Sequence, residues 1–363
     1  MQSSFEYIFP AIRGVQAGRE FYVSMCPLRL IPKIFLFDEE EIIPELRAQR
    51  KINKARVPEI ARYILENKNS YVFSAITASI NGEVRFEPMD SSTDQNRLGI
   101  LHISMNNRFI INDGQHRRAA IEAALREDKD LGDETIAVVF FLDIGLERCQ
   151  QMFADLNRYA IRPSKSLGVL YDNREENSIL TKLIVFRSPI FKDVVEMERS
   201  TLSLRSRKLF TLSSIYFANK ELLQDIDGAF EKRVDLAASY WEEIAKLFPE
   251  WKMVREREIT SSDVRKDFVH SHGIALQALG RLGNALMKEA PSNWKQKIKK
   301  IRNIDWRRSN ASIWEGRAMI GGRLSKSSQN IILTTNILKK QLGLTLSPME
   351  HRLEDAFLRG DHE

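Results

Sequence analysis

Polar and basic side chains crowd together at residues 112–120, which read Asn-Asp-Gly-Gln-His-Arg-Arg-Ala-Ala. The stretch follows the apolar run 109–111 and precedes another apolar run, a pattern that predicts a strand, a tight turn and a helix. We expect Asp113 to cap the helix by accepting a backbone N–H, and Gly114 to let the backbone turn. Unpaired N–H groups and the positive dipole end of a helix suit phosphate binding. The predicted anion clamp consists of Asp113, Gly114, Gln115, His116, Arg117 and Arg118.

The alternative interpretation is a capped surface helix with solvated basic residues, since short motifs often occur by chance. Two later segments favour the clamp. A helix predicted over residues 147–159 ends near Asn157 and Arg158, which we add to the clamp residues, and Pro163 stops this helix. The loop at 162–166 is basic and rich in serine, so it could offer hydroxyl and ammonium donors to the same phosphate, and the alternative is a plain surface loop.

Positive charge is concentrated near the C-terminus. Residues 291–343 hold 12 Lys and Arg against two acidic residues, a local charge of +10, whereas the whole chain carries +6. Clustered cations displace counterions from phosphates, so this region is typical of a nucleic-acid binder, with a solvated basic face as the alternative. A second segment, 199–208, is basic and rich in hydroxyls, and its alternative is a mobile linker. The predicted DNA-binding residues are Arg199, Arg205, Arg207, Lys208, Lys295, Lys297, Lys299, Lys300, Arg302, Arg307, Arg308, Arg323 and Lys326.

The sequence lacks the motifs of several common catalytic sites. It contains no Walker P-loop, no H-E-x-x-H, no G-x-S-x-G and no paired carboxylates at a recognisable spacing. No cluster at ligand spacing accompanies His270 and His272, so we expect no metal there. Cys26 and Cys149 also lack such spacing and are expected to be buried thiols. We therefore name no catalytic residue, no metal and no required cofactor, and the sequence favours a binding protein over an enzyme.

Length and composition indicate a globular protein of two or three domains. Of the 363 residues, 43% are hydrophobic and 29% are charged, close to the averages for soluble proteins. No apolar run approaches the roughly 20 residues that cross a bilayer. The N-terminus lacks the basic start and apolar core of a signal peptide. We expect a cytoplasmic location and no membrane partner.

The part of the chain around the clamp is predicted to mix strands and helices. Strand-like segments occur at 19–25, 71–80, 99–105 and 135–142, and helices are predicted at 38–49 and 57–67. Asn81-Gly82 and Asn106-Asn107 each predict a hairpin turn. The strand at 135–142 is continuously apolar, which indicates burial on both faces. Strand, helix and strand in succession predict a crossover that places the clamp helix against the sheet.

The remainder of the chain is predicted to be mostly helical. We place the domain boundary at residue 174, which gives a mixed domain at 1–174 and a helical domain at 175–363. The predicted helices of the second domain span 177–186, 211–223, 230–248, 274–288, 294–302 and 331–342.

The Asp-Gly-Gln-His-Arg motif at 113–117, followed by Arg-Ala-Ala, resembles the signature of the DGQHR-domain family. The likeness extends to 46–80, which includes Arg56 and Tyr63, to 151–172, and more weakly from Trp314 onward. Over its length the chain resembles the DndB proteins of DNA sulfur modification. More distantly, Gly-x-x-Arg at 114–117 resembles the phosphate-binding motif of the ParB and sulfiredoxin superfamily. Sulfiredoxins carry a catalytic cysteine where this chain has Gln115, which excludes thiol chemistry there.

The resemblance implies an α+β fold in which a ParB/sulfiredoxin-like mixed α/β N-terminal domain precedes a mostly α-helical C-terminal region. It implies a DNA-binding transcriptional repressor of the genes for DNA phosphorothioate modification. The implied partners are double-stranded promoter DNA and other DNA sulfur modification proteins, and a palindromic operator would require a homodimer. It also makes Arg56 a site candidate, with a solvated helix face as the alternative.

Two other functions remain open. The first is a nucleotide-binding or NTP-hydrolysing ParB-like clamp or enzyme in DNA modification or defence, with a nucleoside triphosphate as ligand. The second is a structural adaptor within a modification complex, which also fits a helical second half.

Overall fold

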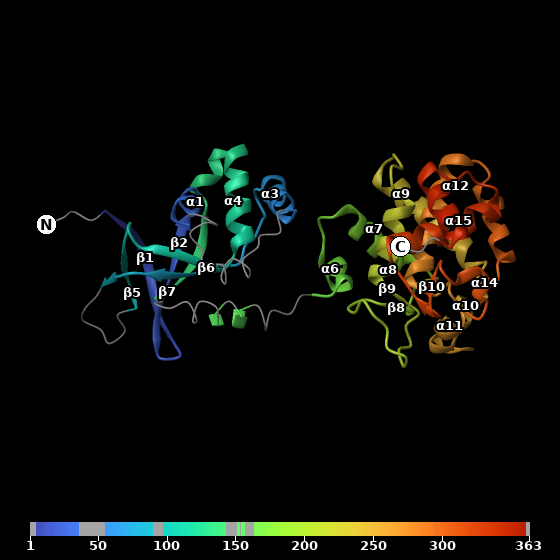
Figure 1. Ribbon diagram of the computed structural model, residues 1–363, viewed down its shortest axis with the longest axis horizontal. Coiled ribbons are helices and arrows are strands. Elements are labelled where there is room, and N and C mark those ends of the chain that lie inside the picture. Colours follow the sequence, from blue (N-terminus) through green and yellow to red (C-terminus); the bar gives the residue numbers. More distant parts are fainter. Residues whose placement is uncertain are drawn as a thin grey trace. The chain divides into compact units, whose positions relative to one another are not determined.

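The protein forms two compact units, Met1–Ile161 and Arg162–Glu363 (Figure 1). The structure is a computed structural model that describes residues 5–35, 55–89, 97–142, 151–152, 154–156 and 163–360. Helix α6 (Lys165–Tyr171) falls in the second unit, and the domain boundary near residue 174 stays a prediction. The helix predicted at 38–49 lies outside the described residues. Of the helix predicted at 147–159, the described residues 151–152 and 154–156 are helical.

The first unit is built on a mixed sheet of seven strands, as expected for a mixed α/β fold. Their order in the sheet is β4-β5-β1-β2-β7-β3-β6. The β3–β7 pair is parallel, and the other pairs in this sheet are antiparallel. The strands are β1 (Glu6–Gln16), β2 (Arg19–Pro27), β3 (Ile76–Asn81), β4 (Val84–Pro88), β5 (Leu98–Ser104), β6 (Arg108–Asp113) and β7 (Thr135–Leu142).

Residues 76–88 and 98–113 form one long, kinked β-ribbon, which corrects the prediction of two hairpins. β3 pairs with β6 and β4 pairs with β5, so both edges of the sheet belong to this ribbon. The predicted turns mark the kink between its halves. Gly82 has a φ of +141°, and Asn107 Nδ2 donates to the Glu83 carbonyl at 2.8 Å across the ribbon. Asn and Gly favour any sharp bend of the backbone, so these residues alone do not specify a hairpin.

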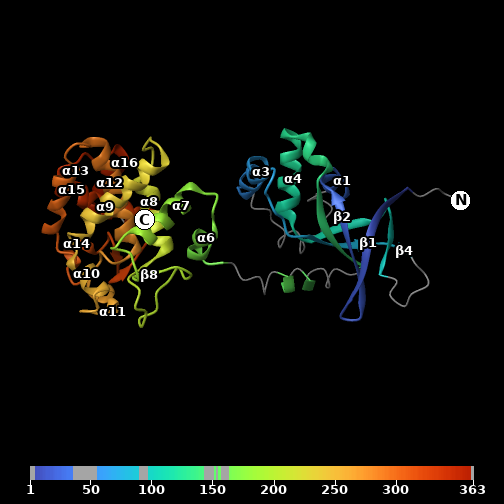
Figure 2. The ribbon, with the colours of Figure 1, turned by 180° about the vertical axis from the view of Figure 1, so that it is seen from behind.

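Helices α1 (Ile31–Ile34), α3 (Arg56–Glu66) and α4 (Gln115–Glu127) cover one face of the sheet (Figures 1 and 2). Two short 3-10 segments, Leu28–Leu30 and Lys129–Asp133, adjoin them. Strand side chains alternate between this buried face and the opposite one. On β1, for example, Phe9 and Ala11 are buried, whereas Ile8 and Ile12 are exposed.

The connection from β6 through α4 to β7 differs from the predicted crossover. β3 lies between β6 and β7, antiparallel to β6 and parallel to β7. β6 and β7 therefore run in opposite directions, whereas a crossover joins parallel strands. α4 still packs on the sheet, as predicted, through buried residues that include Ile121. The prediction that β7 is buried on both faces is wrong. Its Ile136, Val138 and Phe140 are buried, whereas Thr135 is exposed and the side chains between them are half-buried.

The second unit is mostly helical, and its six predicted helices are confirmed. The fifth begins as a short α-helix and continues as a 3-10 segment, Ile298–Asn303. A 12-residue helix near the C-terminus, several shorter helices and two small strand pairs were not predicted. The helices are α7 (Glu176–Arg187), α8 (Leu212–Leu222), α9 (Phe230–Ala245), α10 (Pro249–Arg255), α11 (Ser261–Asp267), α12 (Gly273–Glu289), α13 (Trp294–Lys297), α14 (Ala311–Trp314), α15 (Ser328–Leu342) and α16 (Pro348–Arg359). The strand pairs are β8 (Val195–Glu196) with β9 (Phe210–Thr211), and β10 (Met319–Ile320) with β11 (Arg323–Leu324).

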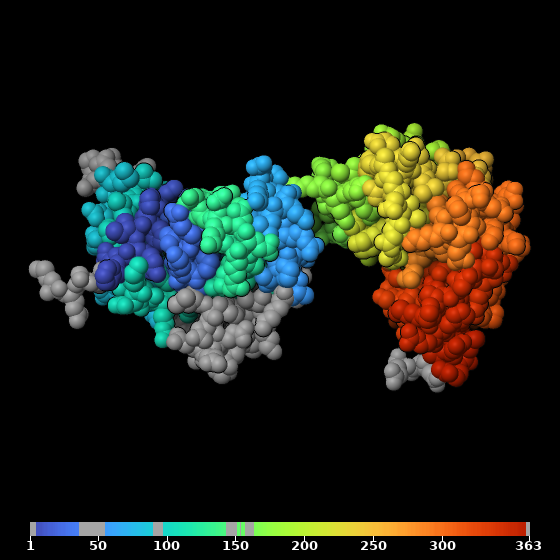
Figure 3. Space-filling view, turned by 90° about the horizontal axis from the view of Figure 1, so that it is seen from above, coloured from blue at the N-terminus to red at the C-terminus, as the bar shows by residue number. Residues whose placement is uncertain are grey.

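The centre of this unit is the contact between α8 and α12. A Cβ on Gly280 of α12 would lie 2.2 Å from the Ala218 carbonyl oxygen of α8, so a glycine is needed for this close approach. Trp241 and Trp251 are fully buried in the same core. The last residues of the chain, red in Figure 3, form one side of the unit.

Candidate functional site

The signature residues form the predicted strand, turn and helix. β6 ends at Asp113, Gly114 has a φ of +112°, and α4 begins at Gln115. The predicted capping role of Asp113 is wrong, because Gly114 is the N-cap residue and no side chain caps the helix. A long helix that starts without a side-chain cap is the arrangement that binds anions in other proteins.

Arg117 folds back over Gly114. Its Nη2 atom donates to Asp113 Oδ2 at 2.7 Å, and a Cβ on Gly114 would lie 3.2 Å from the same nitrogen. The Arg117 side chain is only 15% exposed. The Gly-x-x-Arg spacing therefore has a steric cause: one helical turn places the guanidinium directly above the glycine. Arg117 lies at the helix start, and the Asp113 carboxylate is its anionic partner.

α3 and α4 pack side by side and run parallel. Arg56 at the start of α3 is close enough to affect the charge of His116 at the start of α4. Beyond their other ends, Lys68 Nζ lies 2.5 Å from Asp128 Oδ2. The positive dipole ends of both helices therefore lie together, beside Arg117.

The surroundings of His116 favour its neutral form. Burial lowers the pKa of His116, the positive charge of Arg56 lowers it further, and the Asp113 carboxylate opposes both effects. The positive charge beside this imidazole belongs to Arg56 and Arg117.

The other predicted clamp residues have different surroundings. Gln115 Nε2 donates to the Ile111 carbonyl at 3.1 Å. Arg118 is only 8% exposed, and its Nε donates to the Phe35 carbonyl at 2.9 Å, so it ties α4 to the end of α1. Asn157 and Arg158 lie outside the described residues. Nearby, Asn112 Nδ2 lies 3.3 Å from Met152 Sδ, which brings the segment before Asn157 next to the signature strand.

The predicted basic segment at 199–208 forms the loop between β8 and β9. Arg265 of α11 is 8% exposed, and its Nη2 donates to the Ser203 carbonyl at 2.9 Å, while its Nη1 donates to the Lys208 carbonyl. Ser261 Oγ donates to the Ser206 carbonyl at 2.7 Å. These bonds fix the loop to α11 and disfavour the mobile linker. The loop exposes Arg199, Arg205 and Arg207.

Arg308 joins a second cationic segment to this loop. Its Nη1 donates to the Arg265 carbonyl at 3.4 Å, and its Nη2 donates to the Gly322 carbonyl at 3.1 Å. We call the combined surface the loop face. Its predicted DNA-binding residues are Arg199, Arg205, Arg207, Lys208, Arg307, Arg308, Arg323 and Lys326.

The other predicted DNA-binding residues lie on α13 and the 3-10 segment after it, which we call the helix face. They are Lys295, Lys297, Lys299, Lys300 and Arg302. Trp294, Ile298 and Ile301 anchor this segment in the core. α13 lies at the opposite end of the unit from α11 and β8 (Figure 2). The structure thus divides the predicted set between two surfaces.

None of these thirteen cations forms an ion pair with a carboxylate among the described residues. The remaining cations of the basic region do form such pairs. Arg317 and Lys340 each lie 2.6 Å from Glu354, and Lys339 lies 2.8 Å from Glu350. The basic region therefore contains two kinds of cation: some hold α15 and α16 together, and the predicted DNA-binding ones lack a carboxylate partner.

The serines of the predicted loop at 162–166 and Cys26 make contacts inside the protein. Ser164 caps α6 by accepting the Leu167 N–H at 3.1 Å, and the buried Ser166 lies 3.1 Å from Ser213 Oγ, so both hydroxyls are engaged within the second unit. Burial raises the pKa of the Cys26 thiol to about 12, against a smaller lowering effect from Ser24, and this cysteine is buried as expected. Cys149 lies outside the described residues.

The two histidines near α11 are buried in the second unit. Trp251 Nε1 donates to His270 Nδ1 at 3.0 Å, and His272 Nε2 lies 2.6 Å from the Arg265 carbonyl oxygen. Burial lowers the pKa of His270 to about 3 and that of His272 to about 4. In the part of the chain that the structure describes, no group of three or more His, Cys, Asp or Glu side chains could hold a metal ion.

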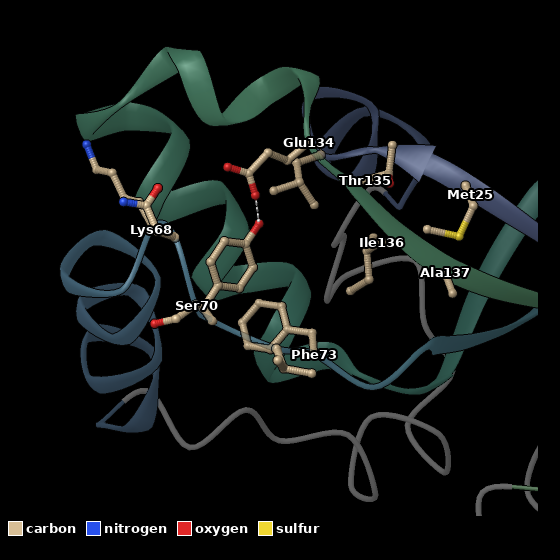
Figure 4. Close-up of a pocket in the computed structure, with 12 residues that line it drawn as sticks. Met25, Lys68, Ser70, Phe73, Glu134, Thr135, Ile136 and Ala137 are labelled. Carbon is tan, nitrogen blue, oxygen red and sulfur yellow. Dashed lines mark hydrogen bonds between the residues drawn. The ribbon is translucent and has the colours of Figure 1, made fainter. Parts of the chain in front are cut away.

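A cavity of about 440 Å³ lies in the first unit, near the ends of α3 and α4 that are remote from the signature (Figure 4). Phe73 lies on one side of it and Ile136 and Ala137 lie on the other, and Tyr71 also lines it. The Tyr71 hydroxyl donates to the Glu134 carboxylate across its upper part. No predicted site residue lines this cavity, and the sequence carries no motif that would have revealed it.

Arg265 is the main functional candidate that the sequence did not reveal. Arg265 fixes the loop by donating to carbonyls that lie up to 62 residues away in the chain. A local sequence pattern cannot predict such a long-range contact.

These features define a two-unit protein with paired helix starts and two arginines at the signature of one unit and, among the described residues, surface cations without carboxylate partners on the other. The chain belongs to the DndB family, which is described as DNA-sulfur modification-associated and whose model matches residues 9–345. The protein is therefore associated with DNA sulfur modification. No curated protein and no solved structure matches the chain. Among the helices described, none is long and apolar enough to cross a membrane.

Proposed function

We propose that this protein binds double-stranded promoter DNA and represses the genes for DNA phosphorothioate modification. The observation that carries the proposal is the loop face, where exposed cations without carboxylate partners surround a loop that Arg265 fixes. Unpaired cations gain most from contact with phosphates, because binding releases the counterions of the DNA. A loop that is already ordered loses little conformational entropy when it binds. The family's association with DNA sulfur modification supports this role.

The start of α12 adds a suitable phosphate contact to the loop face. α12 begins at Gly273 without a side-chain cap. A Cβ at Gly273 would lie 3.4 Å from Lys326 Nζ and 2.8 Å from Ser214 Oγ, so an ammonium and a hydroxyl adjoin the helix start. Helix starts, lysines and serines commonly contact DNA phosphates. We assign the helix face, at the other end of the unit, a separate phosphate contact that is independent of base sequence.

The second candidate function is a nucleotide-binding clamp at the signature. It is favoured by the parallel packing of α3 and α4, which places two positive helix ends beside Arg56, His116 and Arg117. The likeness of the Gly-x-x-Arg motif to that of ParB and sulfiredoxin proteins also supports this function. Its ligand would be a nucleoside triphosphate. Binding without hydrolysis fits the residues better, because Asp113, the acidic residue of the motif, pairs with Arg117.

One experiment separates the two functions. Binding to a promoter duplex is measured over a salt series, with and without ATP or CTP, for the wild type, an Arg205→Ala/Arg207→Ala variant and a His116→Ala/Arg117→Ala variant. If the loop face holds DNA, the first variant binds more weakly and with a smaller salt slope. If the signature holds a nucleotide, the second variant keeps its DNA affinity but loses any response to ATP or CTP. Absence of wild-type binding at low salt would overturn the DNA-binding proposal.

The proposal includes a cytoplasmic location and association with other DNA sulfur modification proteins. The adaptor function would be favoured if the protein co-purifies with those proteins but does not bind DNA.

A further inference from the structure

The sheet face opposite α1, α3 and α4 carries exposed aliphatic side chains. Ile8 and Ile12 of β1 are 59% and 53% exposed, and Met25 of β2 is 55% exposed. Leu98 and Ile100 of β5 are 56% and 36% exposed. Isolated exposed aliphatic residues are common on proteins, whereas a continuous patch of them indicates an interface.

The strand register shows that these residues form one patch. Ile12 is opposite Leu98 on one side and Val23 on the other, and Pro10 is opposite Ile100. Across β2 and β7 the patch continues, since Met25 is opposite Ala137 and Val23 is opposite Val139. Directly opposed side chains lie about 5 Å apart, so the patch is continuous over four neighbouring strands. We call it the outer sheet face, and its residues are Ile8, Pro10, Ile12, Val23, Met25, Leu98, Ile100, Ala137 and Val139.

Several charged residues around the outer sheet face are paired within the chain. Arg13 lies 3.5 Å from Glu20, and Arg85 lies 3.0 Å from Glu87. His102 Nδ1 lies 3.0 Å from Glu6. Arg19 and Arg97 are exposed beside these pairs and have no carboxylate partner among the described residues, so the border carries charges of both signs. Such a border can pair with that of a second copy, whereas DNA favours a surface of cations alone, as on the loop face.

We propose that the outer sheet face is the interface between two copies of this chain. A two-fold interface joins the same patch of both subunits, so it must be complementary to itself. An aliphatic face bordered by charges of both signs meets that requirement, and two such faces pack as the sheets of a β-sandwich do, about 10 Å apart. Its exposed area, on the order of several hundred Å², is as large as a soluble monomer usually shows, and it matches the core of a dimer interface that buries about 800 Å² per subunit.

This inference rests on the first unit alone and does not depend on the proposed DNA binding. If both hold, the dimer would present two loop faces, which is the arrangement that reads a palindromic site.

The test is the mass of the full-length protein in solution, measured by light scattering after size exclusion at micromolar concentration. We expect twice the chain mass of 42.0 kDa for the wild type. An Ile12→Lys/Met25→Lys variant should elute as a monomer, with a dimer dissociation constant at least about a hundredfold higher. The matched controls are Val15→Lys, on the same strand but outside the patch and 69% exposed, and Leu204→Lys, on the second unit and 84% exposed. Both controls should remain dimeric.

Hydrogen exchange of the wild type gives a second readout that does not depend on how the variants fold. Peptides that cover β1 and β5 should exchange more slowly at high than at low protein concentration, whereas those of α8 and α12 should not change. A wild type that is monomeric at every concentration, or an Ile12→Lys/Met25→Lys variant that is as dimeric as the wild type, would overturn the proposal and leave the face to a different partner.

Discussion

Arg265 donates from Nη2 to the Ser203 carbonyl at 2.9 Å, and this bond joins helix α11 to the loop that carries Arg205 and Arg207. The carbonyl of Arg265 in turn accepts a hydrogen bond from Arg308. A buried cation thus positions two exposed cationic segments without competing for an anion itself. The organisation of the loop face depends on this residue.

Replacing Arg265 with methionine should release the loop. The carbonyls of Ser203 and Lys208 would lose their donor, which costs on the order of 3 kcal/mol of unfolding free energy. Trypsin should then cleave after Arg205 and Arg207 faster than in the wild type. Arg302→Met, which removes one bond to the Lys246 carbonyl, serves as the control and should leave the cleavage pattern unchanged. Equal trypsin resistance of the Arg265→Met loop would show that other contacts fix it.

Gly114→Ala should destabilise the protein by about 1–3 kcal/mol, as measured by urea unfolding. Alanine at this position would have to adopt a backbone φ of +112°, which L-residues rarely do. Its Cβ would also lie within 3.3 Å of Ile76 and of the Arg117 guanidinium. Gly168→Ala is the matched control, because Gly168 lies in α6 with nothing within 4 Å of its Cβ position. That substitution should be neutral or slightly stabilising. Equal effects at both positions would contradict the steric account of Gly-x-x-Arg.

Asp113→Asn should tighten the binding of a nucleoside triphosphate if the signature is an anion clamp. The substitution removes the carboxylate that neutralises Arg117 and leaves an amide of the same shape. We expect about tenfold tighter binding by titration calorimetry, and at least tenfold weaker binding for Arg117→Ala. A loss of affinity in both variants would mean that Asp113 itself contributes to ligand binding.

Stability should fall as the pH drops from 7 to 5, because His270 and His272 are held neutral by burial. Their folded pKa values, about 3 and about 4, lie below the unfolded value near 6.5, so the unfolded chain binds more protons in this range. The loss is about 2 kcal/mol for each histidine between pH 6.5 and pH 5. Glu354, whose pKa is about 2 because hydrogen bonds from Arg317, Lys340 and Asn336 outweigh the effect of burial, contributes only at lower pH.

Urea unfolding at pH 7, 6 and 5 measures this slope. A His270→Gln variant should show about half of the wild-type slope, since one of the two histidines no longer titrates. A wild-type stability that stays constant over this range would contradict the buried neutral state of these side chains.

Six helices of the second unit could be predicted because apolar residues recur with a period of 3.6 within each segment, whatever the rest of the chain does. α10 and α11 were missed, because seven residues hold too few apolar positions to establish such a period, and the 12-residue α16 was also not predicted. In the first unit, strand positions were predicted but strand pairing was not. Asn81-Gly82 and Asn106-Asn107 mark real bends, yet which strands pair on either side of a bend depends on residues distant in sequence.

The same limit applies to the candidate sites. The turn at Gly114 was predictable from residue types, whereas the pairing of Asp113 with Arg117 in place of a capping bond was not. Clustered charge identified the basic region, but the sequence did not show that its cations divide between two surfaces. Whether a cation is free or paired depends on the fold, as Arg317 and Arg323 illustrate: the first is buried against Glu354, and the second is exposed.

We propose that the loop face holds DNA phosphates, so its cations should determine how DNA affinity depends on salt. Fluorescence anisotropy with a duplex from the modification promoter would compare the wild type, an Arg205→Ala/Arg207→Ala/Arg323→Ala variant and a control with Lys220→Ala and Lys232→Ala, two exposed cations on α8 and α9. We expect the triple variant to bind more weakly and the slope of log affinity against log salt to become smaller by about 3, while the control keeps the wild-type slope. A triple variant with the wild-type affinity and slope would contradict the claim.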